Sequence, residues 1–264
     1  MLSQTVSPMI MLLIGIFIAL NPPKSVTELK SAATVVAATE EVIIRLEANP
    51  VVTTQPVEAV AETIQKLIEH FKWEGPVGCG FPTPLKNGKC LTGGNLHKDW
   101  KNLKVDDFFK NKTGNTFSVV NDADAAAMGV MEFGVGKAEK GLVITITLGT
   151  GIGSGVFFNG ELLSNFELGR LYGKKGDIME LFASDAARKR NDWDFKKWGK
   201  RLNFFLSHIE KSFNPDLIII GGGVSKKIDH FKRYIDIETP FKSAELKNNA
   251  GIVGAALFAK RSSL

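Results

Sequence analysis

The sequence predicts an α/β protein, because short apolar runs typical of strands alternate along the chain with helical patterns. Two of these runs, Leu142 to Leu148 and Asp216 to Ile220, are rich in β-branched residues, as buried strands are. Both end in glycines, and open α/β sheets bind ligands at the carboxyl ends of their strands. A chain of 264 residues can bury a core as one large domain or as two small ones.

The composition is that of an ordinary soluble protein, with 44% hydrophobic and 23% charged residues. Cys79 and Cys90 form neither a CxxC pair nor a metal-binding spacing, which favours a reduced protein of the cytoplasm. The net charge of +5 is concentrated in residues 174–201, which hold nine basic and five acidic residues. The basic residues there are Lys174, Lys175, Arg188, Lys189, Arg190, Lys196, Lys197, Lys200 and Arg201.

An apolar run from Met9 to Leu20 is too short to span a bilayer, so we expect no membrane association. No Lys or Arg precedes Lys24 and no small-residue cleavage site follows the run, so it lacks the features of a signal peptide. We therefore predict a buried first strand that ends at Asn21-Pro22-Pro23, with secretion as the alternative.

The first half of the chain then predicts strands and helices in turn. The segment from Val57 to Phe71 is an amphipathic helix, because its apolar residues share one face. These residues are Val57, Val60, Ala61, Ile64, Leu67, Ile68 and Phe71. The other expected elements are strand-like pieces at 34–37 and 42–46, a loop at 50–56, a strand at 75–81, a polar loop at 88–100, a strand at 116–120 and a helix at 123–133.

A glycine-rich turn follows the strand that ends at Leu148. Glycines at alternate positions from Gly149 to Gly153 can adopt positive φ and leave backbone N–H groups uncovered, so the turn can form a nest for a phosphate. The Thr150 hydroxyl would be a further donor. No Lys follows, and a short strand at 156–158 stands where a Walker loop has a helix. The alternative is a hairpin whose glycines serve tight packing.

The remainder of the chain predicts a polar loop and then a second alternation of helices and strands. The expected elements are a loop at 164–176, helices at 177–190 and 195–213, the strand that ends at Ile220, the glycines Gly221, Gly222 and Gly223, and helices at 225–234 and 250–260.

Several ordered motifs resemble the ROK family of sugar kinases. These motifs are NDADAA (121–126), TLGTGIGSG (147–155), ELG (167–169), GGGVSKK (221–227) and NNAGIVGAAL (248–257). Two more, GPVGCGFP (75–82) and SDAARKR (184–190), resemble the polyphosphate glucokinases within that family. The resemblance covers roughly Val57 to Lys260. It implies an actin-like ATPase (ribonuclease H-like) fold, with two α/β domains around a cleft. We expect the first domain at 1–120 with the returning C-terminal helix at 248–264, and the second at 121–247.

The resemblance also implies a glucokinase that phosphorylates the 6-hydroxyl of glucose with polyphosphate or ATP, and with Mg²⁺. Phosphoryl transfer needs positioning, charge stabilisation and one base that receives the proton of the hydroxyl. Asp122 matches the family's catalytic aspartate, directly after the strand that ends near Val120. The alternative is that Asp122 only caps the helix that follows.

The same resemblance implies a set of substrate-binding residues. For the sugar these are Asn95, Asn121, Asp122, Glu167, Arg170 and Glu180. For the donor phosphates they are Gly149, Thr150, Gly151, Gly221, Gly222, Gly223 and Lys24. A carboxylate such as Glu180 can accept hydrogen bonds from two vicinal hydroxyls. The alternatives are an ordinary turn residue for Asn95 and a solvated helix face for Glu180.

The chain departs from the family pattern in two places. Arg170 stands where the family has a histidine, and residues 170–184 contain no Cys or His, so we expect no zinc. The family's first strand ends in an aspartate and two glycines, with a lysine soon after. Here Phe17 takes the place of the aspartate, Pro22-Pro23 removes two N–H donors, and Lys24 takes the place of the lysine.

These departures leave three classes of function. The first is an active glucokinase, and the second is a sugar-binding pseudokinase with a degenerate first phosphate loop. A non-native N-terminus is the other explanation of that loop. The third is a ROK-type repressor, which needs a helix-turn-helix for which the N-terminal segment has no room. We therefore expect glucose and a phosphate donor as partners, no nucleic acid, and a cytoplasmic homodimer as is usual in the family.

Overall fold

A computed structural model describes residues 17–19, 55–92, 96–173, 176–244 and 250–262. Two compact units are found, which we call unit 1 (Met1–Gly129 and Asn249–Leu264) and unit 2 (Val130–Asn248). Each unit carries helices on a sheet that contains parallel strands, so the predicted α/β class is confirmed. The predicted domain boundaries at 120/121 and 247/248 stay a prediction. The first unit boundary falls later in the chain, inside a helix.

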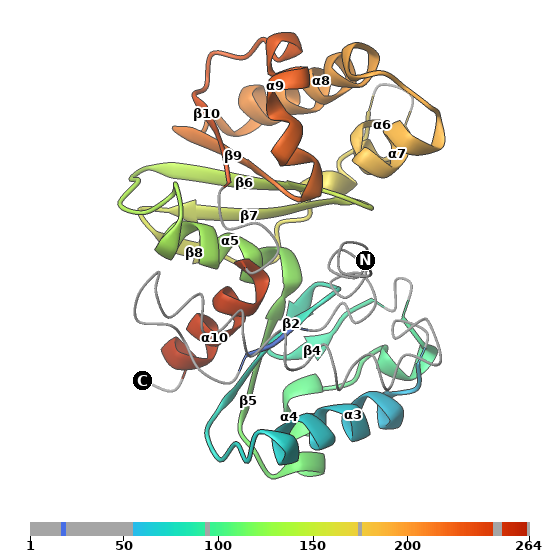
Figure 1. Ribbon diagram of the computed structural model, residues 1–264, viewed down its shortest axis with the longest axis vertical. Coiled ribbons are helices and arrows are strands. Elements are labelled where there is room, and N and C mark those ends of the chain that lie inside the picture. Colours follow the sequence, from blue (N-terminus) through green and yellow to red (C-terminus); the bar gives the residue numbers. More distant parts are fainter. Residues whose placement is uncertain (1–16, 20–54, 93–95, 174–175, 245–249, 263–264) are drawn as a thin grey trace, which may run out of the picture. The chain divides into compact units, whose positions relative to one another are not determined.

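Unit 1 has a small sheet in the order β1-β2-β5, in which β1 is antiparallel to β2 and β2 is parallel to β5 (Figure 1). Its described elements are β1 (Phe17–Ala19), α3 (Val57–His70), β2 (Val77–Phe81), β3 (Leu85–Lys86), β4 (Lys89–Cys90), η2 (Lys98–Trp100), α4 (Val105–Thr113), β5 (Phe117–Asn121), most of α5 (Asp122–Phe133), and α10 (Ala250–Ser262). Of the predicted first strand, only β1 lies within the described residues. The strand-like pieces at 34–37 and 42–46 lie outside them.

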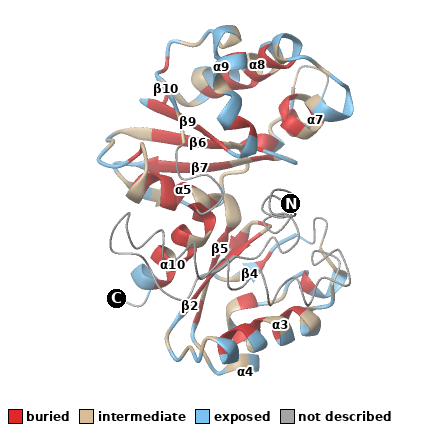
Figure 2. Cartoon of the chain, in the orientation of Figure 1, coloured by how far each residue is buried: buried red, intermediate tan, exposed pale blue. Residues whose placement is uncertain are grey.

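Successive side chains of β2 point to opposite faces of the sheet. Val77, Cys79 and Phe81 belong to the core that α3 and α4 cover. Gly78 points to the opposite face, where a Cβ would overlap the carbonyl oxygen of Ala255 on α10. The strand is buried along its whole length, as Figure 2 shows. The glycine in this strand therefore allows a helix to approach the sheet closely.

Helix α10 packs in the same way against the start of α5. A Cβ at Gly254 would overlap the carbonyl oxygen of Ala125, and one at Gly129 would overlap that of Ala250. These close contacts attach the first turns of α5 to unit 1. They explain why the unit boundary falls after Gly129 and not before the helix begins.

Unit 2 has a five-stranded sheet in the order β10-β9-β6-β7-β8, in which β10, β9 and β6 are parallel and β7 and β8 are antiparallel. Its described elements are β6 (Leu142–Leu148), β7 (Ile152–Phe158), β8 (Glu161–Leu163), η3 (Leu168–Arg170), α6 (Met179–Ala183), α7 (Asp185–Arg190), α8 (Phe195–Phe213), β9 (Leu217–Gly221), η4 (Gly223–Lys227), α9 (Ile228–Phe231), η5 (Lys232–Tyr234) and β10 (Phe241–Ser243). Helices α8 and α9 lie over one face of the sheet (Figure 1).

Three predicted elements differ from the structure. The helix expected at 177–190 is broken at Ser184, whose ψ of 160° is extended and whose hydroxyl accepts the N–H of Ala187 at 3.1 Å. The helix expected at 225–234 is a succession of short turns, η4, α9 and η5. The strand expected at 156–158 begins at Ile152, because its glycines pair in the sheet opposite β6. Helix α4 and strands β3, β4, β8 and β10 were not predicted. No helix among the described residues is long and apolar enough to cross a membrane.

Candidate functional site

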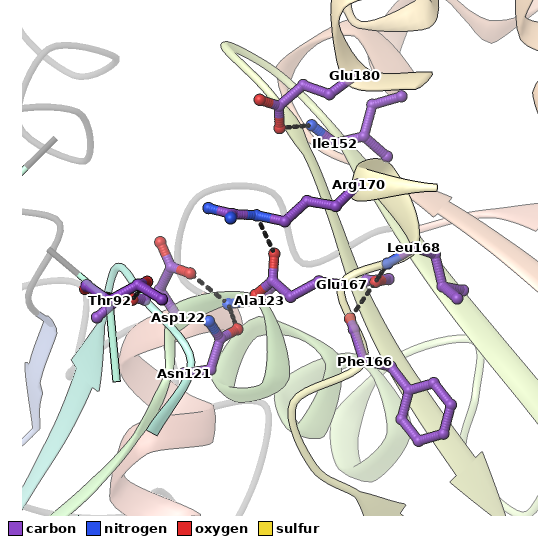
Figure 3. A network of polar contacts seen from close by, with 12 residues as sticks. Thr92, Asn121, Asp122, Ala123, Ile152, Phe166, Glu167, Leu168, Arg170 and Glu180 are labelled. Atoms are coloured by element: carbon purple, nitrogen blue, oxygen red, sulfur yellow. Dashed lines mark hydrogen bonds and ion pairs between the residues drawn. The ribbon is translucent and has the colours of Figure 1, made fainter. Parts of the chain in front are cut away.

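Asn121 and Asp122 lie at the carboxyl end of β5, where the chain enters α5. The Asn121 side chain caps this helix, since its Oδ1 accepts the N–H groups of Ala123 at 2.9 Å and Asp124 at 3.2 Å. Asp122 is the first helical residue, and its Oδ1 accepts the N–H of Ala123 at 2.8 Å (Figure 3). The capping role that the sequence offered to Asp122 therefore belongs chiefly to Asn121.

Strand β2 runs parallel to β5, with Phe81 opposite Asn121, so the residues after both strands lie at one edge of the unit 1 sheet. After β2, the buried hydroxyl of Thr83 lies 2.9 Å from the Thr92 hydroxyl and donates to the Thr92 carbonyl at 3.1 Å. Thr92 is the last described residue before Asn95. This pair was not predicted, because the sequence shows only a threonine between two prolines at this point.

Asn95 and Lys24, the expected sugar and phosphate ligands, lie outside the described residues. So do Lys174 and Lys175 of the basic segment. Their predicted roles stay predictions.

In unit 2, the glycine-rich turn joins β6 to β7 as a tight hairpin loop in which Leu148 pairs with Ile152. None of the glycines from Gly149 to Gly155 has a positive φ. The N–H of Gly149 donates to the carbonyl of Gly151 at 3.0 Å. The predicted nest with left-handed glycines is therefore wrong, and the hairpin interpretation describes the backbone better. Gly149 and Thr150 are exposed.

The second glycine segment follows β9, which pairs with β6 so that Gly221 lies opposite Thr147. Here a left-handed residue does occur, since Gly222 has a φ of 87°. A Cβ at Gly222 would overlap the backbone of Leu148. The two glycine segments therefore end neighbouring strands of one sheet and approach each other closely.

Glu180 lies on α6 and is partly buried. Its Oε2 accepts the backbone N–H of Ile152 at 3.0 Å, as Figure 3 shows. A carboxylate bound to the backbone of a strand is not on a solvated helix face, so that alternative is wrong.

Glu167 is held through its two neighbours in the chain. The hydroxyl of Ser154 on β7 accepts the N–H of Leu168 at 3.0 Å and donates to the carbonyl of Phe166. Arg170 lies 3.6 Å from the Glu167 carboxylate, measured from Nε to Oε2. The sequence analysis missed Ser154, although a lone hydroxyl residue in the apolar run of β7 was a visible signal.

The Glu167 carboxyl titrates above its ordinary range. Burial raises its pKa most, the positive charge of Arg170 lowers it, and the negative charge of Glu180 raises it further. The structure therefore brings Glu167, Arg170 and Glu180 into one electrostatic group within unit 2.

Part of the basic segment is engaged inside unit 2. The Arg188 Nε lies 2.7 Å from Asp185 Oδ1, and Lys189 Nζ lies 2.8 Å from the other oxygen of Asp185. The Arg201 guanidinium carbon lies 3.9 Å from the ring centroid of Trp193 and 4.4 Å from that of Phe182. Arg190, Lys196, Lys197 and Lys200 are exposed. Fewer of the nine charges are available to a ligand than the sequence count indicates.

Among the described residues, no group of three or more His, Cys, Asp or Glu side chains could hold a metal ion. The expectation of no zinc stays a prediction.

A sequence model of the ROK family matches residues 28–169. A polyphosphate glucokinase of Mycobacterium tuberculosis (strain CDC 1551 / Oshkosh) is 39% identical over 208 residues, which cover 78% of each chain. The crystal structure of an inorganic polyphosphate/ATP-glucomannokinase from Arthrobacter sp. strain KM is similar with a TM-score of 0.73 and 37% identity, over 80% of this chain and 86% of that one.

A glucokinase of Streptomyces griseus, solved in complex with glucose and AMPPNP, is similar in fold. The TM-score is 0.65 at 23% identity, over 79% of this chain and 90% of that one. The actin-like ATPase fold predicted from the motifs is confirmed by these structural neighbours.

Replacing Arg170 with glutamine should raise the pKa of Glu167, because the guanidinium charge favours the ionised carboxylate. A folded pKa above the unfolded value, about 4.3, means that Glu167 contributes stability below that value and loses it as pH rises through the folded pKa. The variant should move this loss to higher pH. An NMR titration of the Glu167 side-chain carbon measures the shift. Lys196→Gln, which removes an exposed charge elsewhere in unit 2, is the control. An unchanged Glu167 pKa in Arg170→Gln would contradict the ion pair.

Proposed function

The chain belongs to the ROK family, and we propose that it is a glucokinase that phosphorylates the 6-hydroxyl of glucose with polyphosphate or ATP as the donor. The observation that carries the proposal is similarity over 78% of the chain to a polyphosphate glucokinase. The anchored carboxylates of Glu167 and Glu180 support it, because two fixed carboxylates suit the vicinal hydroxyls of a sugar ring. The pseudokinase alternative depends on Phe17, which lies in β1, and on residues 20–24, which lie outside the described residues. The relatives reported above are named as kinases, which favours the active enzyme.

Asp122 is the proposed base. The oxygen of the 6-hydroxyl attacks the terminal phosphorus of the donor, its proton passes to the Asp122 carboxylate, and ADP or a shortened polyphosphate leaves. The Asn121 amide oxygen caps α5, so a contact of Asn121 with the sugar would be made through its amide nitrogen. Asn95 and Arg170 remain proposed sugar ligands.

The proposed donor site comprises Gly149, Thr150, Gly151, Gly221, Gly222, Gly223 and Lys24. Support comes from the close approach of the two glycine segments at the ends of β6 and β9. Magnesium would neutralise the donor phosphates when bound. Such an ion usually needs only one or two carboxylates besides phosphates and water, so it does not require a larger acidic group. We further propose a cytoplasmic homodimer, as the family resemblance implies.

Asp122→Asn should lower turnover by roughly 10²–10⁴-fold, the usual contribution of a general base. Glucose binding should stay within a few-fold, because the amide keeps the shape of the carboxylate. Steady-state kinetics measure the first effect and calorimetry with glucose measures the second. Asp107→Asn, an exposed aspartate in the first turn of α4, is the matched control and should keep normal turnover. Near-normal turnover in Asp122→Asn would refute the assignment.

Replacing Lys196, Lys197 and Lys200 together with glutamine should weaken polyphosphate use by roughly three- to 150-fold, at about 0.2–1 kcal/mol for each exposed ion pair. ATP use should change less, because a long polyanion needs a basic track beyond the reaction centre. In wild-type protein, polyphosphate affinity should fall faster with salt than ATP affinity. Arg201 is left in place because it stacks on Trp193.

The control for the lysine variant replaces Lys66, Lys101 and Lys110, three exposed lysines of unit 1. If both triple variants use polyphosphate equally well, or if salt affects the two donors alike, the lysines of α8 do not bind polyphosphate.

A further inference from the structure

The turn from Gly149 to Gly151 is attached to α6 and α7 by two hydrogen bonds. The carbonyl of Gly149 accepts the N–H of Ala186 on α7 at 3.0 Å. The N–H of Ile152, the first residue after the turn, donates to Glu180 Oε2 on α6 at 3.0 Å. Leu148, the residue before the turn, packs closely against Gly222. The turn is therefore held at both of its ends without a ligand.

The carboxylate of Glu180 fills the space that a side chain at Gly151 would occupy. The three heavy atoms nearest to a Cβ built at Gly151 are the Oε2, Cδ and Oε1 atoms of Glu180, and the first of them would overlap it. Gly151 has no positive φ, so its backbone conformation is open to other residues. A side chain at Gly151 would therefore displace the Glu180 carboxylate, whereas the conformation of the turn itself would accept one.

A carboxylate has two oxygens, and each can accept hydrogen bonds. In Glu180 one oxygen is bound to Ile152, and no other described residue donates a hydrogen bond to this side chain. We infer that Glu180 is a positioning residue for the donor: one oxygen fixes the phosphate-binding turn while the other serves the sugar. This inference rests on the proposed function and adds a donor role to a residue otherwise assigned to the sugar.

The position of Glu180 has an electrostatic consequence that separates two explanations. A negative charge beside the turn repels donor phosphates, so a Glu180 that acted through its charge alone would weaken donor binding. A Glu180 that holds the turn strengthens donor binding despite that repulsion. Glutamine keeps an acceptor oxygen for the Ile152 N–H and removes the charge, whereas alanine removes both.

The first test measures donor affinity by calorimetry without glucose, using inorganic tripolyphosphate and ATP as probes, each with magnesium. Glu180→Ala should bind both about tenfold more weakly, the loss expected for a hydrogen bond to a charged group. Glu180→Gln should bind them at least as well as the wild type. In kinetics, Glu180→Ala should raise the KM for the donor as well as for glucose, and Glu180→Gln should restore the donor KM. Equal or tighter donor binding by Glu180→Ala would overturn the inference.

The second test asks whether the contact exists, independently of any ligand. Gly151→Ala should lower the melting temperature in the wild-type background, because the new Cβ must push the Glu180 carboxylate away from the N–H of Ile152. The same substitution in Glu180→Ala should cost much less, because the obstructing atoms are gone. Gly173→Ala is the matched control, since its Cβ would meet no atom closer than 3.5 Å and its φ is ordinary. An equal cost of Gly151→Ala in both backgrounds would refute the contact.

The two proposals fail in different ways. If wild-type protein transfers phosphate to glucose and Glu180→Ala binds donors as the wild type does, the positioning role fails and the proposed function stands. If wild-type protein transfers no phosphate from either donor, the proposed function fails, and the donor role of Glu180 fails with it.

Discussion

The beginning of strand β7 is the constraint on which the candidate residues of unit 2 depend. The backbone N–H of Ile152 binds Glu180, and the hydroxyl of Ser154 binds the residues on both sides of Glu167. Hydrogen bonds to charged groups contribute about 1.5–3 kcal/mol, which is enough to fix a side chain in one position. Two residues of one strand, Ile152 and Ser154, therefore hold two carboxylates that come from separate segments of the chain.

This arrangement explains why a long polar segment can carry precise chemistry. Between β8 and α6, the described residues form one short helical turn, η3. They are attached to β7 by the Ser154 hydroxyl and by the close approach of Gly169 to the Ile152 carbonyl. Burial is the main cause of the raised pKa of Glu167; the positive charge of the exposed Arg170 lowers this pKa, and the negative charge of Glu180 raises it further. Arg170 thus forms an ion pair with the Glu167 carboxylate.

Periodic patterns made the regular elements predictable. Strand β6 and helix α8 begin and end where the sequence places them, and α3 buries the expected apolar face. Helix α4 was missed because only Val105 and Phe109 are buried, which leaves no clear apolar stripe. The break at Ser184 was missed because it depends on one hydroxyl that caps α7.

The sequence predicted which residues belong to the candidate site, but few of the contacts that these residues make. The motifs located Asp122, Glu167 and Glu180, but no pattern revealed that Glu180 binds a backbone N–H 28 residues away. The count of basic residues from 174 to 201 also overstated the charge available to a ligand, because Arg188 and Arg201 stack on aromatic rings inside the unit. Such pairings form only when distant segments meet, so a linear pattern does not encode them.

The central claim is that this chain phosphorylates glucose, and the most direct measurement is phosphoryl transfer by the purified wild-type protein. The protein is incubated with glucose and magnesium and given polyphosphate or ATP in separate reactions, and the product is identified by phosphorus NMR. Our account predicts glucose phosphorylated at the 6-hydroxyl with at least one of the two donors. The absence of phosphorylated glucose with both donors, or a phosphate on another hydroxyl, would contradict it.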